Sequence, residues 1–521
     1  MTASFRNPIL RGFNPDPSIL RVGEDYYIAT STFEYHPAVR LHHSKDLRTW
    51  TVVGHALDLD LRGIPDSGGV WAPSLTHADG KFWLAYSIVR TMDGDDKDID
   101  NYLVTAESID GPWSEPVHLG SRGFDFSFFH DADGTHWITG VQWDQRPEHP
   151  SFAGIVLEEY LPDEGRTSGD AALLYQEPTL VEGPNLYRIG DWYYLLLAAG
   201  GTGWNHAITV ARSRERTGPY ERDPEPFVLT SRDAPGIPLQ KAGHGELVQT
   251  PDGEWMLVHL ASRPTLHLGE RYSTLGRETC LQHVVFDDDD WLRLADGGHH
   301  AFAGPDEVGE TSWTDEFEDE TLDSTRWSTL RVAPMPETVD LASRPGWLRL
   351  RGGHSPASVF DQSMIVTRVE EHHAVFATVI DAQPTSTREL AGLIAWYDRR
   401  GWIWLQLGWD TEQGRHVRVV CRDGDGTTRS APVAVPDGAL RMRARVDGPE
   451  LRFDISAIDG DEGWVDAPGV YPAWTLSDDH GSRLRFTGMF LGVRADDLDG
   501  RGWSADFTGV SAHFTERERD R

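Results

Sequence analysis

The chain has 521 residues, of which 39% are hydrophobic, and a formal net charge of −35. This length exceeds one ordinary hydrophobic core and predicts two or three domains. An acidic excess of this size is repelled by phosphate backbones and anionic lipid, so we expect no nucleic acid or membrane partner and favour a small ligand. The 20 tryptophans and 52 glycines are typical of all-β proteins that bind carbohydrate.

Two cysteines, Cys280 and Cys421, are too few for a disulfide framework or a thiolate zinc site. The opening residues, MTASFRNPILRGF, lack the basic and apolar regions of a signal peptide, and no apolar run of about 18 residues occurs. We therefore expect a cytoplasmic protein that meets its substrate as small fragments. The histidine pairs at 299–300 and 372–373 lack supporting ligands and predict no metal site.

One pattern occurs five times in the first 260 residues: a turn-like opening, two or three apolar residues, a polar glycine turn and an aromatic-rich run. The copies are PDPSILRVGEDYYIATS (15–31), WAPSLTHADGKFWLAYS (71–87), FDFSFFHDADGTHWITG (124–140), GPNLYRIGDWYYLLLAA (183–199) and GHGELVQTPDGEWMLVHL (243–260). They align on Ser18, Ser74, Ser127, Asn185 and Glu246 and recur every 53 to 61 residues. Each reads as a β-hairpin followed by further strand-like sequence.

Four-stranded units repeated around an axis form a β-propeller, so residues 1–300 are predicted to be a five-bladed propeller. The alternative, an ordinary sandwich or solenoid, does not explain five copies in register. The first strand of each blade lines the central channel, so residues just before it should face the axis. Two positions before the aligned residues lie Asp16, Ala72, Asp125, Gly183 and His244, and Glu182 is one step earlier in the fourth copy.

The repeat ends at residues 295–312, a glycine-rich and acidic stretch that is typical of a linker. Residues 313–521 contain at least eight short alternating runs, such as HAVFATVID and WIWLQLGW, which predict a β-sandwich. This half carries no obvious catalytic cluster. The predicted fold is therefore all-β, a five-bladed propeller followed by a C-terminal β-sandwich.

Carboxylates that converge on one channel indicate glycoside hydrolysis, because one acid must protonate the leaving oxygen and another must act on water or on the sugar. Acids on different blades favour the wider separation that gives inversion of the anomeric centre. A third carboxylate would raise the pKa of the proton donor by like-charge repulsion. Trp71, Phe33 and Trp143 lie close to the predicted axis in sequence and could stack on a sugar.

These residues make the chain resemble glycoside hydrolase family 43, in particular its two-domain β-xylosidases. The resemblance spans nearly the whole chain. It is carried by FNPDPS, STFEYHP, SGGVWAPSL, GFDFSFFHDADG, EGPNLY, GHGELVQTPDG and LGRET, and in the second half by RPGWLRLRG, DQSMIVTR and FTGMFLGV. It implies a five-bladed propeller, often followed by a β-sandwich, and hydrolysis with inversion.

The resemblance also implies roles. Asp16 matches the general base, Glu182 the general acid, and Asp125 the acid that tunes and orients the general acid. Arg277 matches an arginine that contacts substrate hydroxyls. His244 matches a histidine near the channel centre that helps to organise a calcium ion in some relatives; a structural histidine without metal is the preferred interpretation, so we expect no cofactor.

Trp71, Phe33 and Trp143 are expected to form the walls of the sugar pocket. Phe486, in RFTGMF, is expected to be contributed by the sandwich and to narrow that pocket. Ordinary core packing remains the alternative for each of these aromatic residues.

The expected activity is the release of single β-1,4-linked D-xylose units from the ends of short xylo-oligosaccharides. An α-L-arabinofuranosidase, or an enzyme with both activities, is the nearest alternative. A non-catalytic sugar-binding propeller would be expected to lack one of the three acids, and a retaining invertase-like enzyme would differ in product stereochemistry. Family members often form dimers or tetramers, but no stretch of this sequence proves an interface.

Overall fold

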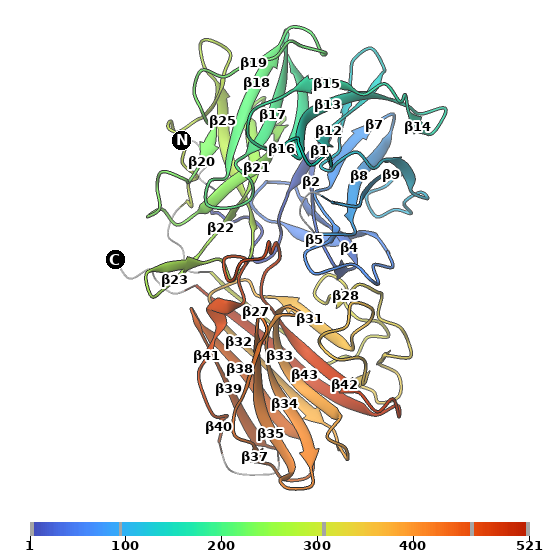
Figure 1. Ribbon diagram of the computed structural model, residues 1–521, viewed down its shortest axis with the longest axis vertical. Coiled ribbons are helices and arrows are strands. Elements are labelled where there is room, and N and C mark those ends of the chain that lie inside the picture. Colours follow the sequence, from blue (N-terminus) through green and yellow to red (C-terminus); the bar gives the residue numbers. More distant parts are fainter. Residues whose placement is uncertain (1–4, 93–95, 305–308, 459–462, 517–521) are drawn as a thin grey trace.

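The computed structural model describes residues 5–92, 96–304, 309–458 and 463–516, which form two β-domains stacked along the long axis of the molecule (Figure 1). The only helix in these residues is a short 3-10 turn, Ala473–Thr475. No helix among them is long and apolar enough to cross a bilayer. The prediction of an all-β chain with a propeller and a sandwich is confirmed.

Five separate antiparallel sheets form the first domain; each is built on four strands in sequence order from the axis outward, and the second, third and fourth sheets have a fifth strand. The first blade contains β1 (Ser18–Val22), β2 (Asp25–Thr30), β4 (Ala38–Ser44) and β5 (Thr51–Leu57). The second contains β7 (Ser74–Ala78), β8 (Lys81–Val89), β9 (Ile99–Ala106) and β10 (Val117–Gly120), with β6 (Gly69–Val70) added to β8.

The other three blades repeat this plan. The third contains β11 (Ser127–His130), β12 (His136–Trp143), β13 (Phe152–Leu161), β14 (Arg166–Thr167) and β15 (Ala172–Tyr175). The fourth contains β16 (Val181–Ile189), β17 (Trp192–Ala199), β18 (Ala207–Ser213), β19 (Glu221–Arg222) and β20 (Leu229–Thr230). The fifth contains β21 (Gln240–Gln249), β22 (Trp255–Ser262), β25 (Glu278–Phe286) and β26 (Leu292–Leu294), and β23 (Thr265–His267) pairs separately with β24 (Glu270–Tyr272).

The second domain packs a nine-stranded sheet on a seven-stranded one. The nine-stranded sheet contains β27 (Glu310–Asp315), β29 (Val339–Asp340), β30 (Leu348–Arg351), β32 (His373–Asp381), β38 (Leu440–Asp447), β39 (Glu450–Ala457), β40 (Val465–Asp466), β41 (Tyr471–Pro472) and β43 (Ser504–Thr515). The other contains β31 (Met364–Arg368), β33 (Glu389–Asp398), β34 (Gly401–Asp410), β35 (Gly414–Asp423), β36 (Gly426–Arg429), β37 (Val433–Ala434) and β42 (Phe490–Asp497). A two-stranded pair joins the domains, β3 (Tyr35–His36) with β28 (Thr329–Leu330).

The residues on which the five sequence repeats align form a ring of hydrogen bonds from blade to blade. The Ser18 hydroxyl accepts from the amide of Leu75 (2.8 Å), and the Ser74 hydroxyl accepts from that of Phe128 (3.4 Å). The Ser127 hydroxyl donates to the Pro184 carbonyl, and the Asn185 amide donates to the Gly245 carbonyl (3.4 Å). Glu246 closes the ring by accepting from the Ser18 hydroxyl and the Ile19 amide, both at 2.9 Å. The repeated polar position therefore joins neighbouring blades.

Two positions before this ring, the backbone turns toward the axis. Asp16, Asp125, Gly183 and His244 all have positive φ, between 42° and 55°. A left-handed conformation is uncommon for residues other than glycine and is maintained only where the surroundings enforce it. The ring of hydrogen bonds and the hairpin that follows it supply this constraint.

A segment of the sandwich, residues 476–489, lies across the propeller; we call it the strap. On the propeller side, the buried Lys241 ammonium forms ion pairs with Asp478 (3.0 Å) and Asp479 (2.6 Å). The amide of Ser273 also donates to Asp479 (2.8 Å), and that of Met489 donates to the Thr274 carbonyl (2.8 Å). Buried charges stabilise a contact only when they are paired, so these bonds define where the strap sits.

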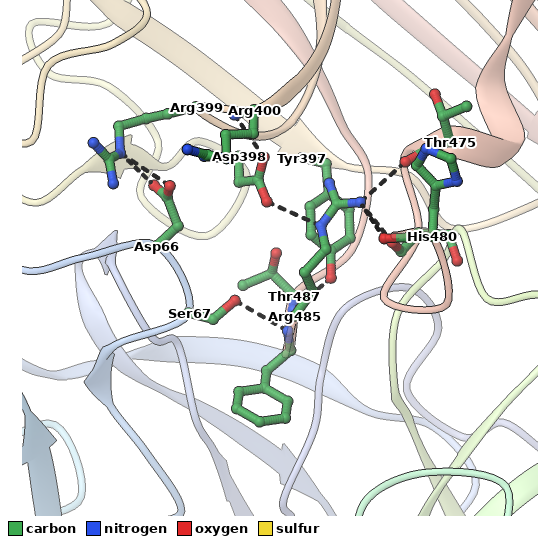
Figure 2. Close-up of polar contacts among 12 residues, drawn as sticks. Asp66, Ser67, Tyr397, Asp398, Arg399, Arg400, Thr475, His480, Arg485 and Thr487 are labelled. Carbon is green, nitrogen blue, oxygen red and sulfur yellow. Dashed lines mark hydrogen bonds and ion pairs between the residues drawn. The ribbon is translucent and has the colours of Figure 1, made fainter. Parts of the chain in front are cut away.

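Within the sandwich, Arg485 holds the strap in shape (Figure 2). Its guanidinium bonds Asp398 (2.9 Å) and lies 3.9 Å from the centre of the Tyr397 ring. It also donates to the backbone carbonyls of Thr475 and His480, and to that of Ser477. The Tyr397 hydroxyl accepts from the Thr487 amide at 3.2 Å. Both residues that flank Phe486 are thereby fixed.

We expect Glu246→Ala to destabilise the propeller. The change removes the acceptor from two buried donors, the Ser18 hydroxyl and the Ile19 amide, and each orphaned group costs about 1–3 kcal/mol. Burial raises the pKa of Glu246 to about 8, so the group is largely protonated near neutral pH and Glu246→Gln is a close mimic. Thermal unfolding of both variants checks this. Equal melting temperatures for the alanine and glutamine variants would contradict a role for the ring.

Candidate active site

A small pocket, about 60 Å³ in volume, opens where the first strands of the blades begin, and the sandwich closes one side of it. Its lining residues come from all five blades and from the strap: Asp16, Phe33, Trp71, Ala72, Phe124, Asp125, Glu182, Thr202, His244, Arg277 and Phe486. The structure therefore brings eight of the nine residues singled out from the sequence to one place. Trp143 is the exception.

Asp16 is held by polar contacts on both carboxylate oxygens. The Arg277 guanidinium donates to one oxygen at 2.7 Å, and the Ser31 hydroxyl donates to the other at 2.5 Å. Asp16 is 4% exposed, and it has a positive φ between Pro15 and Pro17. The two prolines, the left-handed backbone and the two donors together fix this carboxylate at the mouth of the channel.

Glu182 differs from Asp16 because none of the described residues offers its carboxyl a hydrogen bond. Burial and the negative charge of Asp16 raise the pKa of Glu182 to about 7, against the opposing effect of Arg277. Near neutral pH this carboxyl therefore holds a proton for much of the time. A buried carboxyl that is partly protonated and free of partners can donate its proton to a bound molecule.

Asp125 is linked to Glu182 through the backbone. Its carboxylate accepts a hydrogen bond from the amide of Gly183, the next residue after Glu182, at 2.9 Å. Burial raises the pKa of Asp125, and Glu182 and Asp16 raise it further, whereas His244 lowers it. Asp125 therefore contacts the backbone beside Glu182, through the Gly183 amide, and not the Glu182 carboxyl itself.

Arg277 connects the acids to the strap. One nitrogen of its guanidinium bonds Asp16 and also donates to the Thr202 hydroxyl at 3.2 Å. Another donates to the backbone carbonyl of Phe486 at 3.1 Å. The guanidinium also lies 5.3 Å from the centre of the Phe33 ring, within the range of cation–π attraction.

The His244 side chain packs against Gly183 and lies near Asp16. Its Nε2 faces Gly183 so closely that a Cβ there would lie 2.9 Å from it, and its Nδ1 is 3.9 Å from Asp16. Among the described residues, no three His, Cys, Asp or Glu side chains converge around His244.

Aromatic rings form the remaining walls of the pocket. The centre of the Phe486 ring lies 6.0 Å from that of Phe33 and 5.6 Å from that of Trp71, and the Phe486 backbone amide donates to the Ser67 hydroxyl at 3.0 Å. The Trp71 indole donates to the Ser67 carbonyl at 3.0 Å. Ser67 thus fixes two walls of the pocket, Trp71 of the propeller and Phe486 of the sandwich.

Trp143 does not line this pocket. β12 shifts register between Gln142 and Trp143, and the Trp143 ring lies behind Phe124, 5.6 Å from it. Lys97 covers the Trp143 ring at 4.5 Å. Phe124 occupies the wall position that the sequence analysis gave to Trp143. The position of Phe124 directly before Asp125 could have indicated that it lines the pocket. No feature of the sequence indicated the same for Thr202, which also lines it.

The chain matches known families over both domains. Residues 5–292 match glycosyl hydrolases family 43, and residues 314–511 match the β-xylosidase C-terminal concanavalin A-like domain. A relative from Humicola insolens, Xylosidase/arabinosidase 43B, is 42% identical and the match covers 96% of both chains. A xylan 1,3-beta-xylosidase from a Vibrio species is 39% identical over 97% of this chain and 98% of its own.

A solved structure has the same architecture. The xylan beta-1,4-xylosidase of Bacillus halodurans C-125 superposes with a TM-score of 0.93 and 41% identity, over 98% of this chain and all of that one. Both domains are thus shared in sequence and in fold. The chain belongs to glycoside hydrolase family 43.

Proposed function

We propose that the protein is an inverting, exo-acting glycoside hydrolase that releases single D-xylose units from the non-reducing ends of β-1,4-linked xylo-oligosaccharides. The observation that carries this proposal is the convergence of Asp16, Asp125 and Glu182 in a pocket too small for more than a short piece of substrate. The names of its relatives, xylosidases and a xylosidase/arabinosidase, support the choice of sugar.

In this mechanism Asp16 is the general base. Its oxygens are oriented by Arg277 and Ser31, so a water held against them is aligned for attack on the anomeric carbon. Glu182 donates its proton to the oxygen of the leaving sugar as the glycosidic bond breaks. Asp125 fixes the peptide after Glu182 and thereby orients the proton donor.

The strap supports exo action. Phe486 closes one side of the pocket and is fixed by the Ser67 hydroxyl and the Arg277 guanidinium. A polysaccharide chain that must pass through the site would meet this wall, whereas the end of a chain can enter. The leaving part of the substrate then lies outside the pocket.

Two finer choices concern the substrate. A single-sugar pocket can accept arabinofuranose as well as xylopyranose when their hydroxyls fall in similar places, and one relative carries both activities in its name. The choice between a 1,3- and a 1,4-linkage depends on how the leaving sugar fits at the mouth of the pocket. The relatives include both a 1,3- and a 1,4-xylosidase. A non-catalytic sugar-binding propeller is disfavoured because all three acids line the pocket.

The stereochemistry of the product tests the mechanism. We expect proton NMR of the hydrolysis of an aryl β-D-xylopyranoside to show α-xylose before mutarotation, because inversion converts a β-linkage into an α-product. From xylopentaose, xylose and xylotetraose should appear first. Initial β-xylose would indicate a retaining enzyme, and early xylobiose or xylotriose would overturn exo action. Relative kcat/KM on aryl β-D-xylopyranoside and α-L-arabinofuranoside identifies the preferred sugar.

Substitutions should separate the two catalytic roles. Glu182→Gln is expected to reduce kcat on xylobiose by about 10²–10⁴-fold, but much less on a dinitrophenyl xyloside, whose leaving group needs no proton. Asp16→Asn should reduce kcat on both substrates, because water activation is needed for each. Circular dichroism and the melting temperature verify folding. The role of Glu182 would be contradicted if Glu182→Gln lost the same share of kcat on both substrates. The role of Asp16 would be contradicted if Asp16→Asn retained a tenth or more of the wild-type kcat.

The pH profile follows from the raised pKa of Glu182. Proton donation requires the protonated form, so kcat/KM on xylobiose should be present below about pH 7 and decline as pH rises through that value. This decline forms the basic limb of the profile. In Glu182→Gln, assayed on the dinitrophenyl xyloside, this limb should disappear. A wild-type profile that stays flat to pH 9 would contradict it.

A further inference from the structure

Outside the pocket, two adjacent histidines and one aspartate converge on the surface of the propeller. His299 Nε2 lies 2.9 Å from one carboxylate oxygen of Asp233, and His300 Nε2 lies 2.8 Å from the other. The three ligand atoms all lie within 4.8 Å of one another. We call this group the surface triad; none of its members lines the catalytic pocket.

From the sequence alone we expected no metal site at residues 299–300, because this histidine pair lacks supporting ligands nearby in the sequence. The missing ligand is 66 residues away in sequence, in the turn after β20. The backbone brings the two segments together: the amide of Thr230 donates to the His299 carbonyl at 2.7 Å, and Thr230 forms a parallel bridge with His300. The convergence of the side chains is therefore built into the fold.

The geometry suits a tetrahedral transition metal ion. Zinc binds imidazole nitrogen and carboxylate oxygen at about 2.0–2.2 Å, so its ligand atoms lie about 3.3 Å apart. One ligand atom from each of the three residues lies within 4.8 Å of the other two, so small rotations of these side chains bring them to this spacing. Side-chain exposures of 32%, 44% and 53% for His299, His300 and Asp233 leave room for water at the fourth position.

The types of ligand atom also suit a transition metal ion. A bound ion would replace the two Nε2 protons that now face the Asp233 carboxylate. Nitrogen ligands favour Zn²⁺ over the hard ions Ca²⁺ and Mg²⁺, which take oxygen ligands.

We propose that Asp233, His299 and His300 form a structural site for a divalent transition metal, with Zn²⁺ as the ion of choice. Such an ion would connect the turn after β20, in the fourth blade, to the segment after β26, where the chain leaves the last blade. It would stabilise the end of the propeller and take no part in the reaction. This proposal does not depend on the function proposed above.

Calorimetric titration of the tag-free, full-length protein with ZnCl₂ in a buffer that does not chelate metal tests the site. We expect one Zn²⁺ per chain and a melting temperature that rises with Zn²⁺ but not with Ca²⁺, because an ion that binds the folded state stabilises it. In the double variant His299→Ala/His300→Ala, affinity should fall by at least about tenfold. Asp233→Asn should weaken binding while preserving a hydrogen-bond acceptor.

A matched control is His354→Ala, which removes an exposed histidine that also pairs with an aspartate, Asp361, at 2.7 Å but lacks a second histidine. This variant should bind Zn²⁺ as the wild type does. Turnover without added metal should be unchanged in all of these variants, because none of the substituted residues lines the pocket. Absence of a stoichiometric site, or equal affinity in the double variant, would overturn the proposal and leave the triad as plain hydrogen bonds.

Discussion

The hydrogen bonds between blades at the aligned residues are the constraint on which the active site depends. Each of Ser18, Ser74, Ser127, Asn185 and Glu246 ties its own blade to backbone or side-chain atoms of a neighbouring one. With these residues fixed, the positions just before them turn toward the axis, and Asp16, Asp125 and His244 do so with left-handed backbones that cost about 1–3 kcal/mol each when nothing enforces them. The scaffold thus places side chains at the axis whatever their chemistry.

The pocket is completed by a second constraint, the strap between the domains. Arg277 donates both to Asp16 and to the carbonyl of Phe486, so one guanidinium sets the orientation of a pocket acid and the position of a pocket wall. Inside the sandwich, the Arg485–Asp398 ion pair holds the residue next to Phe486. Because these groups are buried and paired, the strap has little freedom to shift without breaking charged contacts. The sandwich domain is therefore part of the active site.

Much of this arrangement could be predicted from the sequence because it repeats. Five hairpins with the same turn chemistry indicated five blades, and the period placed Asp16, Asp125 and His244 at equivalent positions. Trp143 was misplaced because a register shift at the end of β12 follows no repeat, and Phe124 takes its position instead. Thr202 was missed because only a tertiary contact brings it to Arg277. The surface triad was missed for the same reason, since Asp233 is distant in sequence from His299 and His300.

The electrostatics of the pocket link the two halves of the proposed reaction. Glu182 and Asp16 occupy the same poorly hydrated space, yet only Asp16 has donors on both oxygens. Burial and the charge of Asp16 both raise the pKa of Glu182, which helps this carboxyl to keep a proton near neutral pH. The base must stay ionised for the acid to stay protonated, so a change that neutralised Asp16 would remove water activation and would also weaken the hold of Glu182 on its proton. Arg277 opposes this effect at Glu182 while it orients Asp16, and it thereby keeps the pKa of the acid low enough for its proton to be transferred.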